Sequence, residues 1–203
     1  IVVEATAVQQ ARSGPLLRLG EDRFIPGHRE LVRRAHEAGP GKMALQIIHF
    51  LKIARSGWRQ TIDMLAPRDL DGIVRDHAAA AVRAREAGYD AVELHMAHAY
   101  TLSSFLSRLN RRPDADGGRS LESRLRLPTE VAQTVRSAVG ADFPVGVRFD
   151  GEECVKGGYG LQDAEAIAVR LARAGMDYIS LSAGGKFEDA QHRPGQVQQF
   201  VAG

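Results

Sequence analysis

The most constraining feature of this chain is a repeating unit, in which a short apolar run precedes a helical pattern that ends at a glycine. Such runs are typical of buried strands, and the longer periodic segments are typical of amphipathic helices. The apolar runs cover residues 1–8, 42–50, 89–97, 143–150 and 177–184. The helical patterns cover residues 27–39, 70–88, 119–140 and 160–175. This alternation predicts parallel strands joined by right-handed crossovers.

Two architectures fit the alternation, an open doubly wound sheet and a (β/α)8 barrel. The segment after the first predicted strand, TAVQQARSG at residues 6–14, lacks the G-x-G-x-x-G spacing of a dinucleotide-binding sheet. We therefore predict an α/β fold of the TIM-barrel class, with about five of the eight strands that a barrel needs. Residues 1–203 are expected to form one partial barrel domain.

The ends of the predicted helices are marked by glycines. Gly39, Gly88, Gly140 and Gly175 follow the four helical patterns, and each is expected to adopt the left-handed backbone that ends a helix. Pro128 falls inside the third pattern, where a proline removes a backbone N–H from the helix. That helix is expected to kink or restart there.

Polar side chains share one face of four successive predicted strands. Side chains alternate between the two faces of a strand, which places Gln46, His95, Arg148 and Ser180 on corresponding faces near the C-terminal strand ends. Glu93 lies on the same face as His95. In a parallel barrel, this end of the strands forms the rim that carries the active site.

The segment ELHMAHAY at residues 93–100 places His95, His98 and Tyr100 directly after the third predicted strand. The residues alone leave three interpretations open, namely catalytic groups, metal ligands together with Glu93 and His49, and packed core side chains. Histidine is the commonest metal ligand. However, the segment has no aspartate to orient a metal-bound imidazole. We predict no metal site, chiefly because of the family resemblance described next.

Several longer stretches then resemble the old yellow enzymes, or NADH:flavin oxidoreductases, which are FMN-dependent (β/α)8 barrels. The resemblance covers nearly the whole chain, and its most specific part is residues 93–108 together with GGRSLESR at 117–124. In family terms the five strands are the second to the sixth. The first strand is then expected upstream, and the last two, with their FMN-phosphate loops, downstream. The other matching stretches are EATA, MALQIIHF, PVGVRFD and KGGYGLQDA.

The resemblance implies cofactor contacts for three residues. Gln46 would hydrogen-bond the flavin pyrimidine edge, since an amide offers both a donor and an acceptor. Arg148 would place a permanent positive charge where negative charge accumulates on reduction. Ala5 would let its backbone approach the flavin ring closely. The alternative for Arg148 is a buried ion pair with Glu93 or Glu4, and we favour the cofactor contact.

The resemblance also implies catalytic roles for the 93–100 segment. His95 and His98 would bind the carbonyl oxygen of the substrate and stabilise the charge that develops there. Tyr100 would deliver a proton as general acid, since a phenol carries its proton at neutral pH. The implied function is an FMN-dependent NAD(P)H oxidoreductase of the ene-reductase type, which reduces an activated C=C bond. One alternative is an inactive partial barrel that serves as a binding or assembly subunit, and a weaker one is a metal-dependent hydrolase.

The chain departs from the family pattern at three places. Asp116 stands where the family commonly has a tyrosine, and HFLKIARSGW at residues 49–58 lacks the H-x-G-R pattern of many members. The stretch at residues 183–191 resembles the 2,4-dienoyl-CoA reductase-like, iron–sulfur-containing subgroup. Because Cys154 is the one cysteine, a 4Fe–4S cluster is expected only outside this chain. The tail at 191–203 matches neither of the two missing strands.

Composition gives little direction on partners. The net charge is only +2 with acids and bases interspersed, so we expect no nucleic-acid partner and no membrane association. The expected partner is a small enone or enoyl-type substrate, and a homo-oligomer is left open. A single cysteine fits a reducing, cytoplasmic setting.

Overall fold

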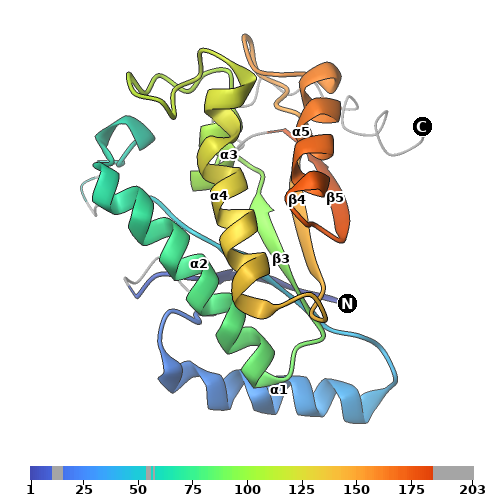
Figure 1. The fold of residues 1–203 in the computed structure, drawn as a ribbon. Helices are drawn as coiled ribbons and strands as arrows, with labels where there is room; N and C mark the ends of the chain where they lie inside the picture. Colours follow the sequence, from blue (N-terminus) through green and yellow to red (C-terminus); the bar gives the residue numbers. More distant parts are fainter. Residues whose placement is uncertain (11–15, 54–55, 57, 185–203) are drawn as a thin grey trace.

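The computed structural model describes residues 1–10, 16–53, 56 and 58–184, so the predictions for the tail and for most of 183–191 lie outside the described residues. Its centre is a parallel sheet whose five described strands pair in chain order (Figure 1). The strands are β1 (Val2–Ala7), β2 (Ala44–Ile48), β3 (Ala91–Met96), β4 (Val145–Glu152) and β5 (Tyr178–Ala183). The helices are α1 (Ile25–Ala38), α2 (Pro67–Ala87), α3 (Thr101–Leu106), α4 (Leu121–Val139) and α5 (Leu161–Arg173), with short 3-10 turns η1 (Asp22–Phe24) and η2 (Ile62–Met64).

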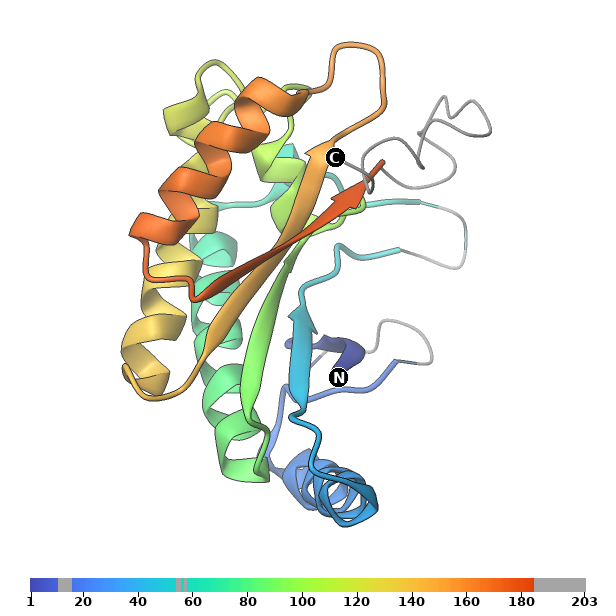
Figure 2. The same cartoon turned by 90° about the vertical axis from the view of Figure 1, so that its right-hand side faces the viewer.

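The strand order and the position of the helices identify the sheet as a barrel wall. A doubly wound sheet reverses its strand order and carries helices on both faces. Here the order never reverses, and α2, α4 and α5 cover one face only (Figure 2). Helix α2 packs on β2 and β3, and α5 packs on β4 and β5. The predicted partial TIM barrel is therefore confirmed.

Apolar packing between the sheet and the helices forms the core. On the helix-facing side of β3 and β4, Leu94, Val147 and Phe149 are fully buried. Helix α2 packs along α4, and Ala80 and Ala84 in the middle of α2 are fully buried. Small residues let two helices approach closely, which explains the alanine-rich middle of α2. Within the described ranges, no helix combines the length and apolarity needed to span a membrane.

The helix ends follow the prediction only in part. Gly88 ends α2 in the left-handed conformation with φ of 94°, and Gly140 and Gly175 also have positive φ. Gly39 has φ of 172°, so the prediction of a left-handed cap there is wrong and the chain leaves α1 in an extended conformation. The predicted restart at Pro128 is also wrong. Helix α4 continues through this residue, whose ring is buried.

The strand register confirms the predicted polar face. Gln46 is paired with Glu93, His95 with Arg148, and Arg148 with Ser180. Paired residues on neighbouring parallel strands point to the same side of the sheet. The polar row therefore lies on the face opposite the helices, which is the interior side of a barrel.

At the base of this interior face, Gly146 lies directly under the ring of Tyr178. A Cβ atom at Gly146 would lie 2.0 Å from Tyr178 Cζ. We expect Gly146→Ala to displace the ring and to lower the free energy of unfolding by about 1–3 kcal/mol, the usual cost of overpacking. Chemical denaturation of the variant measures this cost. Gly151→Ala is the matched control in the same strand, because its added Cβ meets no atom closer than 3.7 Å. Equal stability of the two variants would contradict the argument.

Candidate active site

The interior face is organised by one fully buried carboxylate, Glu93 on β3. Its Oε1 accepts hydrogen bonds from Gln46 Nε2 (2.7 Å) and from Arg148 Nε (3.1 Å). Its Oε2 accepts from Ser180 Oγ at 2.9 Å, and Arg148 also donates from Nη1 to Ser182 Oγ at 3.3 Å. Glu93 thus links the two predicted cofactor-binding side chains, Gln46 and Arg148. In the sequence analysis, Glu93 was one of two alternative ion-pair partners for Arg148.

The third predicted cofactor contact, Ala5, lies in β1. The pairing of β1 with β2 shifts register between Val3 and Thr6, so Ala5 sits in an irregular part of the strand. Its side chain is half-buried. A register shift bends a strand and re-aims its backbone. Ala5 is therefore partly accessible, in an irregular segment of β1.

The structure brings His95 and His98 into direct contact. His95 Nε2 and His98 Nδ1 are 3.1 Å apart, and the backbone N–H of Ala97 donates to His95 Nδ1 at 3.3 Å. Because Nδ1 of His95 accepts, its Nε2 carries the proton and is the donor toward His98. Burial, followed by the nearby His98 and Arg148, lowers the pKa of His95 to about 3. Burial and Arg148 also lower the pKa of His98. Both imidazoles are therefore neutral near pH 7.

Tyr100 completes this group at the start of α3. Its ring stands edge-on to His95, with centroids 5.4 Å apart, and edge-on to Phe50 at 4.9 Å. Perpendicular contacts of this kind hold an aromatic ring in a defined orientation. The three predicted catalytic residues therefore converge at the C-terminal end of β3.

His49, named above as an alternative metal ligand, has different partners. Its Nδ1 lies 3.0 Å from Thr101 Oγ1, and Thr101 donates its own proton to the carbonyl of His49. Burial, with His77 as a second cause, lowers the pKa of His49 to about 3. Among the described residues, no group of three or more His, Cys, Asp or Glu side chains is arranged to hold a metal ion.

A cavity of about 690 Å³ opens beside Tyr100. It lies between the segments that follow β2, β3 and β4, at the end of the sheet where His95 and His98 lie. Its walls mix apolar and polar side chains, as small-molecule sites do. Lining residues include Phe50, Ile62, Tyr100, Asp150, Glu153 and Val155.

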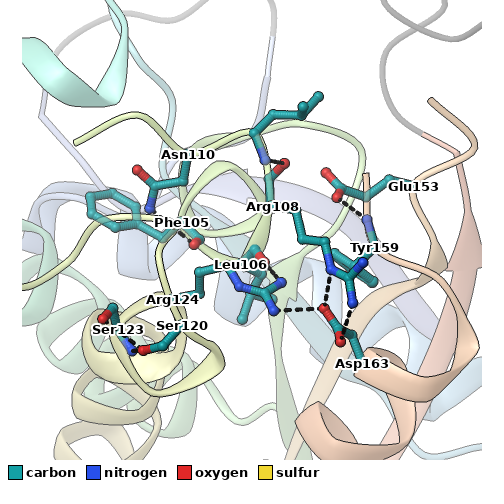
Figure 3. Close-up of polar contacts among 12 residues, drawn as sticks. Phe105, Leu106, Arg108, Asn110, Ser120, Ser123, Arg124, Glu153, Tyr159 and Asp163 are labelled. Carbon is teal, nitrogen blue, oxygen red and sulfur yellow. Dashed lines mark hydrogen bonds and ion pairs between the residues drawn. The ribbon is translucent and has the colours of Figure 1, made fainter. Parts of the chain in front are cut away.

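The stretch GGRSLESR forms a structural brace next to this cavity (Figure 3). Asp163 at the start of α5 accepts from Arg108 and from Arg124, the latter at 2.6 Å, and Arg124 also donates to the carbonyl of Leu106. The Ser120 side chain caps α4 by accepting from the backbone N–H of Ser123. The GGRSLESR stretch therefore ties α3, α4 and α5 together and does not itself enter the site.

The departure at Asp116 is accommodated within the same loop. The Asp116 carboxyl is buried, and its nearest cation is Arg126 at 3.7 Å. Burial raises the pKa of this carboxyl. The backbone carbonyl of Asp116 accepts a hydrogen bond from Asn110 Nδ2 at 2.7 Å. Gly118 in the same loop lies so close to Asn110 that an added Cβ atom would be 2.3 Å from the Asn110 carbonyl oxygen.

Asp150, near the end of β4, is a site residue that the sequence analysis did not identify. Its side chain is 1% exposed, and its Oδ2 accepts from the backbone N–H of His98 at 2.9 Å and from Ser103 Oγ at 3.2 Å. Burial raises its pKa to about 7. The signal in the sequence was a carboxylate two residues after Arg148, on the same strand face.

The raised pKa of Asp150 gives a prediction for stability. The unfolded chain releases this proton near the reference pKa of 3.8, whereas the folded chain holds it until about pH 7. The stabilising contribution is therefore complete below pH 3.8 and is lost as the pH rises through 7. We expect Asp150→Asn, which has no such proton, to gain in melting temperature relative to wild type between pH 5 and pH 8. A difference that does not change with pH would contradict this assignment.

Comparison with known proteins places this geometry in a family. Residues 51–197 match the NADH:flavin oxidoreductase / NADH oxidase family. The NADH oxidase of Thermoanaerobacter brockii is 35% identical in an alignment of 186 positions, which covers 83% of this chain and 28% of that protein. The NADPH dehydrogenase of Halalkalibacterium halodurans is 36% identical over 199 residues, covering 91% of this chain and 58% of that protein. The chain therefore spans well under two thirds of the length of these relatives.

Solved structures agree with the sequence matches. Morphinone reductase superposes with a TM-score of 0.73 at 26% identity, covering 98% of this chain and 63% of that one. A 2-naphthoyl-CoA reductase complex gives a TM-score of 0.82 at 23% identity, with 96% and 35% covered, and supports the fold alone. The expectations of a TIM barrel, of FMN and of NAD(P)H are confirmed. The chain belongs to the NADH:flavin oxidoreductase / NADH oxidase family of FMN-dependent TIM-barrel enzymes.

Proposed function

We propose that this chain carries the reaction centre of an FMN-dependent NAD(P)H oxidoreductase that reduces activated C=C bonds, such as those of α,β-unsaturated carbonyl compounds. The observation that carries the proposal is a convergence. Gln46, Glu93 and Arg148 form one hydrogen-bonded row, and His95, His98 and Tyr100 stand at the end of the same sheet face.

The row of side chains fits a flavin. Gln46 donates one N–H to Glu93, which leaves its carbonyl oxygen and second N–H for a heterocycle with both donors and acceptors. The Arg148 side chain is 31% exposed, and its Nη2 donates to no described residue. These two side chains, with the backbone at Ala5, would hold the flavin ring. When bound, FMN supplies the hydride chemistry, and the surrounding residues orient and tune it.

The neutral histidine pair supports binding of a carbonyl oxygen. A neutral imidazole carries one N–H, and His95 directs its Nε2–H to the gap that it shares with His98. A substrate oxygen that replaces His98 Nδ1 as the acceptor would receive the N–H of His95 Nε2, and His98 would offer its own N–H on Nε2 as a second donor. Donors placed where negative charge develops lower the barrier of such reactions. The low pKa of His95 keeps this donor in the same form across the neutral range.

Tyr100 is the group best placed to deliver the proton. Its ring contacts His95 on one side, and the residue lines the cavity of about 690 Å³ on the other. A substrate held by the histidine pair and extending into this cavity would pass the phenol. A cavity of this size suits a small organic molecule.

Anaerobic spectroscopy of the purified protein tests the proposal. We expect flavin absorbance bands, bleaching by NADPH or NADH, and return of the bands when cyclohex-2-en-1-one is added. Flavin bands that the enone does not restore would refute the ene-reductase chemistry. A protein without flavin bands that also fails to bind added FMN would favour the inactive binding subunit instead.

A further inference from the structure

The connection between β3 and α3 contains a strained turn. His98 has φ of 59° and Ala99 has φ of 53°, so two successive residues with side chains adopt the left-handed backbone. This conformation is unfavourable for residues other than glycine, and it persists only where the surroundings fix it. The turn lies directly between His95 and Tyr100, so its shape sets how the histidine pair and the phenol lie relative to each other.

The Asp150 carboxylate on the neighbouring strand fixes this turn. Its Oδ2 accepts from the His98 backbone N–H at 2.9 Å and from Ser103 Oγ at 3.2 Å. Ser103 Oγ in turn accepts from the Ala99 backbone N–H at 3.2 Å. The two left-handed residues are thus held, one directly and one through a serine hydroxyl, by a single carboxylate oxygen.

The other oxygen of this carboxylate is in an unusual position. Asp150 Oδ1 is buried and has no hydrogen-bond partner among the described residues. Buried carboxylate oxygens without partners are rare, because the lost hydration is not replaced. Asp150 also lines the cavity beside Tyr100. The unpaired oxygen of Asp150 lowers the stability of the fold, and Asp150 borders the proposed substrate cavity. Asp150 is therefore a candidate for a role in the reaction.

We propose that Asp150 is a positioning residue, which acts through the His98–Ala99 turn to aim His98 and Tyr100 at the substrate. This inference rests on the proposed function, since it assumes that the histidine pair and Tyr100 act on the substrate. When ionised, Asp150 gives charge-assisted hydrogen bonds, which are stronger than those to a neutral acid. The turn is therefore held most firmly when the carboxylate is charged.

The groups around Asp150 determine how it titrates. Glu153 follows it in the segment after β4 and raises its pKa, and the bonds from His98 and Ser103 lower it, but burial is the largest cause. The same segment also contains Tyr159 and Cys154. The Tyr159 hydroxyl donates to the Asp150 backbone carbonyl, and burial raises the pKa of both Tyr159 and Cys154.

Two substitutions separate charge from hydrogen bonding. Asp150→Asn keeps an oxygen that accepts from His98 and Ser103, whereas Asp150→Leu has a similar size and accepts nothing. The flavin-loaded protein is reduced with dithionite and mixed anaerobically with cyclohex-2-en-1-one, and reoxidation is followed against enone concentration and pH. We expect Asp150→Leu to lower the second-order rate by on the order of 10²-fold, the cost of misplaced groups. Asp150→Asn should lose much less at pH 8.

The pH dependence of the half-saturating enone concentration distinguishes the proposed role of Asp150 from a purely structural one. In wild type, the half-saturating enone concentration should rise as the pH falls from 8 to 6, because protonation weakens the hold on the turn. In Asp150→Asn it should stay level. Asp116→Asn, which changes a buried carboxyl whose pKa burial also raises but which neither contacts the turn nor lines the cavity, should keep the wild-type pH dependence.

Each result decides between the proposals. Wild-type reduced flavin that the enone does not reoxidise would refute the proposed function, and this inference with it. If wild type reacts, a wild-type rate in Asp150→Leu overturns the inference alone. If Asp150→Leu does not fold, an unchanged pH dependence in Asp150→Asn overturns it equally.

Discussion

Replacing Tyr100 by phenylalanine is expected to slow enone reduction by about 10²–10⁴-fold, the usual contribution of a general acid. Flavin reduction by NAD(P)H should be nearly unchanged, because hydride transfer to the flavin needs no proton from this phenol. The ring keeps its edge-on contacts with His95 and Phe50, so its orientation and packing are retained. Stopped-flow absorbance of the two half-reactions measures both rates.

The control for this substitution is Tyr89→Phe. Tyr89 is buried, and its hydroxyl lies 2.9 Å from His28 Nδ1, in the packing of α1 against the end of α2. Tyr89→Phe removes the same hydroxyl group at a position far from Tyr100, so the rates of both half-reactions should be unchanged. Equal losses in both half-reactions of Tyr100→Phe would show that the residue supports the flavin site in general and is not the proton donor.

The second large effect concerns stability. Glu93→Leu removes the acceptor for Gln46, Arg148 and Ser180 at once. Loss of one partner of a buried ion pair costs about 3–5 kcal/mol, and here we expect the lower part of that range because the Arg148 side chain is 31% exposed. Urea denaturation of the flavin-free protein measures the free energy of unfolding.

A double substitution tests whether the cost comes from the orphaned charge. Adding Arg148→Met to Glu93→Leu replaces the ion pair by apolar side chains of comparable volume, and such replacements are often close to neutral. We expect the double variant to recover most of the lost stability. If the double variant is less stable than Glu93→Leu alone, the guanidinium is stabilised by something other than Glu93.

Strand phase explains why much of this site was predictable. Once PVGVRFD and AVELHMA are recognised as buried strands, alternation alone places Arg148, His95 and Gln46 on a common face, and the register confirms it. The roles given to these residues came from the family resemblance, and the proposed experiments still have to test them. Glu93 illustrates the limit, because alternation gives its face but not which of several cations it contacts.

The contribution of Asp150 was not predictable for a different reason. It depends on a turn in which His98 and Ala99 adopt backbone angles that neither residue favours, and no local preference signals such a turn. One prediction for a helix end was wrong for a similar reason. Gly39 permits a left-handed cap but does not require one, and the tertiary path after α1 is extended there.

The chain-order pairing of the five strands has a consequence for how the molecule is made. Each strand pairs with the neighbour that precedes it in the sequence, so partners emerge from the ribosome in succession. The entropic cost of closing a loop grows only slowly with its length, so each new strand can pair with its neighbour at a cost set by one crossover. Gln46, Glu93, His95, Tyr100 and Arg148 all lie between β2 and β4. We expect the sheet face that carries these residues to take shape on the nascent chain before the segments that follow β5 have been translated.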